Sequence, residues 1–250
     1  MSAVVSIWMW IASTTLIVMW YPALLIRKLF DRDPVRYATG RMFRDLGLVI
    51  TKINPLWKIE VIGADKVKNP RNPYVVVSNH QSMADIPVLS HLPWEMKWMA
   101  KKELFSTPFI GWQLKLAGDI PVERENPRDA VRSIRKARAY LSQKCSVMVF
   151  AEGSRSPDGT VRDFLDGAFR LAIDVGVPVL PIVVDGTFNC LPKKSWKFGK
   201  ATDIKIVVLD PIDTSEMERE DIGTLRDLVR DTIVSRLSKM RAEARSRDQA

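Results

Sequence analysis

The sequence predicts an α/β fold: a mostly parallel sheet covered by helices on both faces, preceded by an N-terminal two-helix membrane anchor. Three observations support this prediction. Short apolar, β-branched runs alternate with helical runs over residues 57–209, which is typical of parallel strands joined by crossover helices. The first 26 residues carry no charged side chain. Hydrophobic residues make up 46% of the 250 residues, enough for a full core.

The uncharged stretch 1–26 is long enough to cross a membrane. As a helix it would extend over about 39 Å at ~1.5 Å per residue, against a hydrocarbon core of ~30 Å. It carries aromatic residues of the kind found near lipid headgroups: Trp8, Trp10, Trp20 and Tyr21. A cleaved signal peptide fits less well, because no positive residue precedes the apolar run and no A-x-A site follows it. A buried core helix is the other interpretation.

Basic residues follow this stretch at once, namely Arg27, Lys28 and Arg32. They predict that the rest of the chain lies on the cytoplasmic side of the inner membrane. The pair Asp33–Pro34 predicts an N-cap and the first turn of a second helix, over residues 34–53. Membrane contact and packing on the domain both fit its apolar stripe. Residues 1–55 are therefore predicted to be the anchoring motif, and residues 56–250 the α/β domain with its C-terminal helix.

The domain is predicted to contain strands at 57–63, 74–78, 95–100, 119–122, 146–150, 178–184 and 203–209. The clearest helix between them covers residues 127–144. The last helix is predicted to begin with a capping box from Ser215 to Glu218. Its apolar residues recur at helical spacing, which predicts docking on the domain: Ile222, Leu225, Val229, Ile233, Leu237 and Met240.

The charge balance predicts an anionic partner. The formal net charge is +9 and the pI is about 9.6, which suits nucleic acid, a phospholipid surface or a phosphorylated substrate. The apolar N-terminus and the lack of a recognition motif argue against nucleic acid. Cys145 and Cys190 share no ligand spacing with each other or with a histidine, so reduced thiols and no metal are predicted.

A histidine and an acid follow the predicted strand 74–78. Sites in parallel sheets lie beyond the carboxyl ends of the strands, which is where His80 and Asp85 would fall. A histidine can take a proton from an alcohol when an anionic partner fixes its tautomer. The alternative is that Asp85 only caps the following helix, since the spacing alone is weakly specific.

Other predicted strands end in polar residues at the same edge. Strand 146–150 is followed by Glu152, Gly153, Ser154 and Arg155; strand 95–100 by Lys101 and Lys102; and strand 119–122 by Arg124. Glycine allows close backbone approach, and arginine offers a planar fork that matches phosphate. Together these residues predict a base beside an anion-binding cradle. His91 lacks a partner motif and is interpreted as structural, while Trp94 and Trp98 fit a core, an acyl channel or a lipid-facing surface.

Four segments resemble the glycerolipid acyltransferases. "NHQSMAD" resembles their N-H-x4-D block and "FAEGSRS" their F-P-E-G-T-R-S block, with Ala151 and Ser154 replacing the usual proline and threonine. "GDIPVER" resembles the block that ends in a phosphate-binding arginine, and "VPVLPIVV" the proline-bearing fourth block. They occur in the family's order over roughly residues 56–210, and resemble most the bacterial 1-acylglycerol-3-phosphate (lysophosphatidic acid) acyltransferases.

The resemblance implies a direct acyl transfer that yields phosphatidic acid. An acyl thioester, on coenzyme A or acyl carrier protein, would acylate the 2-hydroxyl of lysophosphatidic acid, with His80 as the base and Asp85 orienting it. Arg124, with Lys101, would hold the acceptor phosphate; Asn79, Glu152, Gly153, Ser154 and Arg155 would complete the acceptor site. No bound cofactor or metal is implied, and the partners would be the two substrates and the bilayer. The alternatives are an acyltransferase for another lysolipid, such as lyso-ornithine lipid, or a non-catalytic lipid-binding protein.

Overall fold

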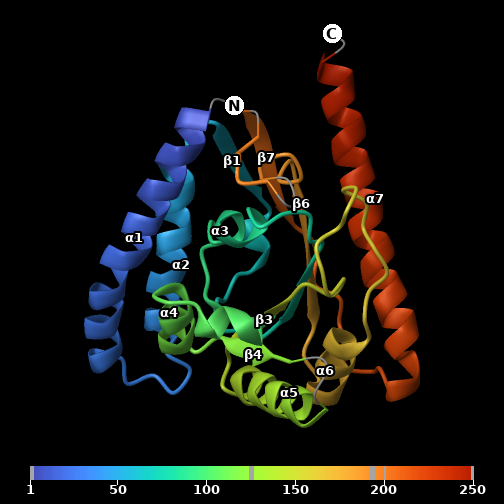
Figure 1. Cartoon of the computed structure of the whole chain (residues 1–250). Helices are drawn as coiled ribbons and strands as arrows, with labels where there is room; N and C mark the ends of the chain where they lie inside the picture. The colour runs from blue at the N-terminus through green and yellow to red at the C-terminus, as the bar shows by residue number, and fades with distance from the viewer. Residues whose placement is uncertain (1–2, 124–126, 192–194, 200, 249–250) are drawn as a thin grey trace.

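The computed structural model describes residues 3–123, 127–191, 195–199 and 201–248. Within them, seven strands form one sheet (Figure 1). The strands are β1 (Trp57–Ile62), β2 (Val75–Ser78), β3 (Met96–Lys101), β4 (Ile120–Val122), β5 (Ser146–Val149), β6 (Val179–Asp185) and β7 (Thr202–Val208). Each coincides with a predicted strand to within one or two residues at either end, because their β-branched and apolar residues suit a buried, pleated surface.

The strand order is β1-β7-β6-β2-β5-β3-β4. All neighbours are parallel except β6 and β7, which run antiparallel. The predicted, mostly parallel sheet is therefore confirmed, while the reversal at β7 was not anticipated. The central strand β2 lies between β5 and β6, with Val75 level with Val147 and Val179. Its carboxyl end, where the chain continues into His80, thus lies near the middle of the sheet.

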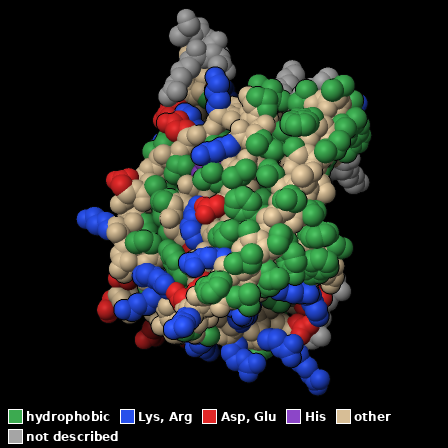
Figure 2. Space-filling model, turned by 90° about the vertical axis from the view of Figure 1, so that its left-hand side faces the viewer, with side chains coloured by type: hydrophobic (Ala, Val, Ile, Leu, Met, Phe, Trp, Pro, Cys, Tyr) green, Lys and Arg blue, Asp and Glu red, His purple; other side chains and the backbone are tan. Residues whose placement is uncertain are grey.

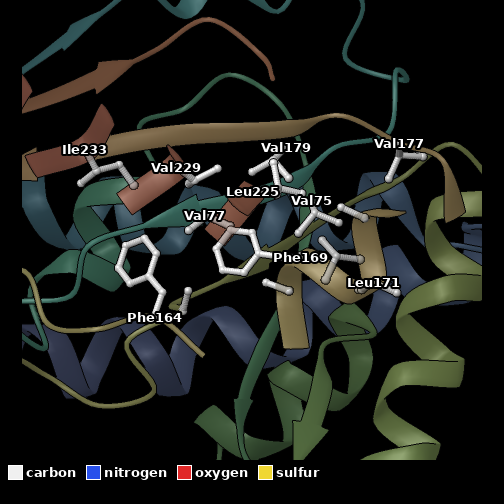
Figure 3. Packing of buried hydrophobic residues seen from close by; sticks show 14 of the residues in the cluster. Val75, Val77, Phe164, Phe169, Leu171, Val177, Val179, Leu225, Val229 and Ile233 are labelled. Carbon is white, nitrogen blue, oxygen red and sulfur yellow. The ribbon is translucent and has the colours of Figure 1, made fainter. Parts of the chain in front are cut away.

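Helices cover both faces of the sheet (Figure 1). They are α1 (Ala3–Phe30), α2 (Tyr37–Lys52), α3 (Asp85–Leu89), α4 (Ile110–Ala117), α5 (Pro127–Ser142), α6 (Gly167–Val175) and α7 (Ile222–Asp248). Side chains alternate across β2: Val75 and Val77 pack with α6 and α7, as Figure 3 shows, whereas Val76 faces the opposite layer with residues of α3. Both layers are apolar, which is what a parallel sheet requires.

Two predicted helix starts are wrong. The second helix begins at Tyr37 rather than at residue 34, because the Asp33 side chain accepts a hydrogen bond from the amide of Val35 and holds residues 33–36 in a turn. The capping box predicted at Ser215 lies at Glu218 and Asp221, where a short 3-10 turn leads into α7. The Ser215 hydroxyl instead donates to Asp213. The docking predicted for α7 is confirmed, since its apolar stripe is buried.

A buried network of four charges joins α2 to the sheet. Arg44 contacts both oxygens of Asp119 at 2.5 and 2.7 Å, and Lys97 contacts Glu95 at 2.9 Å. Arg44 also reaches Glu95 at 3.4 Å. The charges balance in number and are fully or almost fully buried, as buried ions must be. Gly40 permits the close approach, because a Cβ there would meet the Glu95 carboxylate at 2.0 Å. The sequence pattern gave no sign of this network.

In the described part of the chain, α1 alone is long and apolar enough to cross a membrane, and 17% of its most apolar window is buried. Its inner side packs on α2 and α4 through a cluster that includes Leu24 and Leu46. Its outer side leaves large apolar residues exposed, among them Ile11, Met19 and Leu29. Figure 2 shows this apolar face, with Lys and Arg side chains around it. Water-soluble domains rarely leave an apolar face of this size exposed. The outer side of α1 therefore points to a lipid or protein partner.

Candidate active site

The chain turns sharply after β2, and Asn79 fixes the start of this turn. Its side-chain amide donates to the Val184 carbonyl at 2.8 Å and accepts from the Val184 amide at 2.9 Å. The side chain thereby continues the pairing of β2 with β6 beyond the last strand residue. Asn79 is fully buried, so the described geometry gives it a role in shaping the turn. Substrate contact by Asn79 stays a prediction.

The next residue, His80, meets Asp85 as the five-residue spacing predicted. The distance from His80 Nδ1 to Asp85 Oδ2 is 2.7 Å. The same oxygen accepts hydrogen bonds from the amides of Gln81 and Ser82, at 2.7 and 2.9 Å. Asp85 is also the first residue of α3. The interpretation of Asp85 as a helix cap is not supported, because the N-cap is Ala84 and α3 has no side-chain cap bond. The carboxylate instead closes the turn before the helix and contacts the imidazole.

The environment of the pair is suited to a fixed imidazole. Asp85 is fully buried, whereas 14% of the His80 side chain is exposed. The Phe150 ring stacks on the imidazole at 3.9 Å between centroids, with 14° between the planes. His80 Nε2 makes no hydrogen bond with any residue that the structure describes. One ring nitrogen is thus bound to a carboxylate and the other is left for a reactant, which is the arrangement a general base requires.

Glu152, from the turn after β5, holds the backbone of His80. Its Oε1 accepts from the His80 amide at 2.7 Å and its Oε2 from the Arg162 amide at 3.1 Å. The His80 carbonyl in turn accepts from the Ser156 amide at 2.8 Å. Burial raises the pKa of the Glu152 carboxyl, and the two backbone amides oppose that shift. Glu152 therefore acts on the histidine through the backbone, a contact that sequence reasoning did not find.

Glu152→Gln is expected to lower the free energy of unfolding by about 1–3 kcal/mol, because an amide group replaces one acceptor and leaves a buried backbone N–H unpaired. Chemical denaturation of the detergent-solubilised chain would measure the loss. Glu216→Gln is the matched control, since Glu216 is exposed and is expected to tolerate the change within ±0.5 kcal/mol. Equal stability of the two variants would contradict the role given to Glu152.

The remaining predicted residues of this turn differ in their surroundings. Gly153 has φ 76°, a left-handed conformation that a side chain would strain. Ser154 is exposed, and its hydroxyl accepts from Arg162 at 2.5 Å. The Arg155 guanidinium is half-buried and makes no hydrogen bond or ion pair with the described residues. Within the described residues it is thus a charge without a counter-ion, next to the His80 turn.

The predicted cations on the neighbouring strands are only partly described. Lys101 ends β3, level with Val122 at the end of β4, and its ammonium is exposed. Arg124 lies outside the described residues, so its assignment to the acceptor phosphate stays a prediction. Lys102 pairs with Asp129 at 2.6 Å. The carboxyl ends of β2, β3 and β5 point to the same end of the sheet, as their parallel pairing requires.

The other residues considered in the sequence, His91, the two tryptophans and the two cysteines, lie away from the His80 turn or in the core. His91 Nε2 contacts the Thr51 hydroxyl at 2.7 Å, and burial lowers the pKa of His91. Trp94 and Trp98 are buried in the core layer that contains Val76. Cys145 and Cys190 are free and buried, and burial raises the pKa of each thiol to about 12. Among the described residues, no group of three His, Cys, Asp or Glu side chains is placed to hold a metal ion.

Two comparisons with known proteins match this chain, one by sequence and one by structure. The model described as Acyltransferase matches residues 58–185. A solved structure, the 1-acyl-sn-glycerophosphate (LPA) acyltransferase PlsC from Thermotoga maritima, superposes with a TM-score of 0.81 at 26% identity. That comparison covers 96% of this chain and 95% of the Thermotoga chain. The superposition therefore includes the N-terminal helices as well as the sheet.

Curated relatives carry the same family name. The chain is 33% identical to 1-acyl-sn-glycerol-3-phosphate acyltransferase alpha of Homo sapiens, over 85% of this chain and 77% of the human protein. It is 35% identical to the chloroplastic 1-acyl-sn-glycerol-3-phosphate acyltransferase BAT2 of Brassica napus, over 64% of this chain and 46% of that protein. The chain thus spans about half the length of the plant relatives that it matches.

Proposed function

The chain belongs to the acyltransferase family, and from this membership we propose that it transfers a fatty acyl chain to the 2-hydroxyl of 1-acylglycerol 3-phosphate, giving phosphatidic acid. The observation that carries the proposal is the His80–Asp85 pair at the carboxyl end of the central strand. The relatives' names supply the acceptor. The acyl donor is proposed to be a thioester of coenzyme A or of acyl carrier protein.

The proposed reaction needs no acyl-enzyme. His80 Nε2 accepts the proton of the acceptor hydroxyl while Asp85 stabilises the imidazolium that forms. The hydroxyl oxygen attacks the thioester carbonyl carbon, a C–O bond forms, and the C–S bond breaks. The departing thiolate then takes the proton from Nε2, which restores the neutral imidazole. Both cysteines are buried with raised thiol pKa values, which does not suit a nucleophile.

The acceptor is the part of this proposal that a single experiment tests best. Purified chain in detergent would receive a labelled acyl thioester and a panel of lysolipids, including lysophosphatidic acid, lysophosphatidylcholine and a lyso-ornithine lipid. Phosphatidic acid is expected to be the main product. A product formed only from another lysolipid would overturn the acceptor, and the absence of thioester consumption with every lysolipid would overturn the enzyme.

Arg124→Ala is expected to lower kcat/KM for lysophosphatidic acid by roughly 10–150-fold, since a charge-assisted hydrogen bond contributes about 1.5–3 kcal/mol. The prediction rests on the sequence block "GDIPVER". Arg124→Lys should recover part of the loss, because it keeps the charge without the fork. Kinetics with each substrate varied in turn would measure the effect. Impairment toward the thioester alone would place Arg124 at the donor.

The exposed face of α1 is proposed to attach the chain to the membrane. Removing residues 1–28 is expected to release much of the protein from membranes washed with high salt, because salt screens the remaining basic contacts. Sedimentation would measure the bound fraction. Since the deletion also removes buried Leu24, a second variant that replaces exposed Ile11 and Met19 by Ser serves as a milder test. Unchanged retention of both variants would place the attachment elsewhere.

A further inference from the structure

A basic cavity of about 520 Å³ lies along the free edge of the sheet, beside β4. Its lining includes Arg36 before α2, Lys115 of α4, and Lys136 and Tyr140 of α5. Two strands separate β4 from β2 in the sheet order. At ~4.8 Å per step, the cavity is about 14 Å from the strand that carries His80. No role proposed above uses these residues.

Three cations of this cavity have no carboxylate partner among the described residues. Arg36 donates to the carbonyls of Lys115 and Leu116, at 3.1 and 3.3 Å. Lys136 donates to the Asp119 carbonyl at 2.8 Å, and the Lys115 ammonium makes no hydrogen bond or ion pair in the described part of the chain. The Asp119 carboxylate is bound to Arg44 on the inner side. The lining thus contains more cations than carboxylates, since Asp119 is its one acid and is already bound to Arg44, and this excess positive charge favours an anionic ligand.

Two of the three cations, Arg36 and Lys136, are held in place before any ligand arrives. Arg36 adopts a left-handed conformation, with φ 50° and ψ 48°, which a residue with a side chain rarely adopts. Such outliers gather at functional sites. Lys136 and Tyr140 are fixed because they bond the outward carbonyls of Asp119 and Gly118 at the sheet edge. Burial lowers the pKa of Lys136, Asp119 opposes that shift and Arg36 adds to it, so a bound anion would stabilise the charged ammonium further.

We propose that Arg36, Lys115 and Lys136 form a binding site for a phosphate group, separate from the His80–Asp85 pair. A guanidinium and two ammonium groups supply the fork and point charges that phosphate binding uses. The cavity is much larger than one phosphate, so the ligand carries further groups. Two sources fit this chemistry: the nucleotide phosphates of a coenzyme A donor, or the headgroup of an anionic lipid. The lipid source is within reach because Lys115 belongs to α4, which packs on α1; Figure 2 shows Lys and Arg side chains next to the apolar face.

The test compares wild type with a Lys115→Gln/Lys136→Gln double variant of the full chain in detergent. Calorimetric titration with coenzyme A probes the soluble source. Co-sedimentation with phosphatidylcholine vesicles, with and without phosphatidylglycerol, probes the lipid source. Lys58→Gln is the matched control, because Lys58 is an exposed lysine on β1, at the opposite edge of the sheet. Thermal melting checks the folding of each variant. If the double variant unfolds, Lys115→Glu replaces it, since Lys115 is exposed.

Removal of the two charges is expected to weaken one of the two interactions by about 10-fold or more, while Lys58→Gln leaves both unchanged. A loss confined to coenzyme A assigns the site to the soluble donor. A loss confined to phosphatidylglycerol vesicles assigns it to lipid. Equal binding of both probes by wild type and variant would overturn the proposal. Neither binding assay depends on acyl transfer, so a failed phosphate site and a failed catalytic assignment give different results.

Discussion

Replacing His80 with alanine is expected to lower the rate of acyl transfer by ~10²–10⁴, the range that general-base catalysis contributes. The variant loses the only proposed proton acceptor for the 2-hydroxyl. It keeps the turn, because the His80 amide and carbonyl, rather than its ring, bond Glu152 and Ser156. Steady-state assays with saturating thioester and lysophosphatidic acid would measure kcat, and the loss should lie mainly there rather than in KM.

The chain offers a matched control in its second histidine. His91→Ala removes an imidazole that contacts Thr51 and no residue of the proposed site. It is expected to lose stability while keeping kcat per folded molecule. If His80→Ala retained near-normal kcat, or if both histidine variants lost the same rate, the proposed base would be wrong.

Asp85→Asn is expected to reduce kcat by a comparable ~10²–10⁴, for a different reason. The amide has nearly the shape of the carboxylate, so one oxygen can still accept from the amides of Gln81 and Ser82. It carries no negative charge, however, and cannot stabilise the imidazolium that forms when His80 takes the proton. If the amide instead turned its N–H toward the ring, it would give up the bonds from Gln81 and Ser82 and would favour the wrong tautomer, an effect worth ~10⁴ in the best-studied triad.

The double variant separates these roles. If Asp85 acts only through His80, then His80→Ala/Asp85→Asn should be about as slow as His80→Ala alone. Additive losses would show that Asp85 contributes independently, for example by holding the turn. Circular dichroism and melting of Asp85→Asn would check the turn directly, because a collapsed turn should lower stability together with the rate.

The sequence predicts the elements of this fold better than their arrangement. Runs such as Val75–Val77 predict strands because their residue types suit a buried sheet, whatever position the strand takes in that sheet. The antiparallel direction of β7 depends on how the chain returns after β6, which no local pattern contains. The start of α2 was missed because Asp33 bonds the amide of Val35 and forms a turn there, although the same residue types also cap helices.

The candidate site shows the same division. The His80–Asp85 contact lies within five residues, so a local pattern could predict it. The bond from the His80 amide to Glu152 joins segments far apart in sequence, and Glu152 was instead predicted to bind substrate. The basic cavity combines Arg36, Lys115 and Lys136, each of which reads as an ordinary surface charge in its own segment. Contacts that depend on tertiary packing were therefore beyond sequence reasoning.

The position of β1 at the sheet edge has a consequence for synthesis of the chain. Within the described sheet its sole neighbour is β7, with Trp57 level with Thr202. At ~5–20 residues per second, β7 leaves the ribosome roughly seven to thirty seconds after β1. During that interval β1 is an unpaired strand beside a membrane-seeking helix. Lys58 and Glu60 alternate with the apolar residues of β1 and give the unpaired strand one charged face. These charges discourage pairing with another nascent chain before β7 is made.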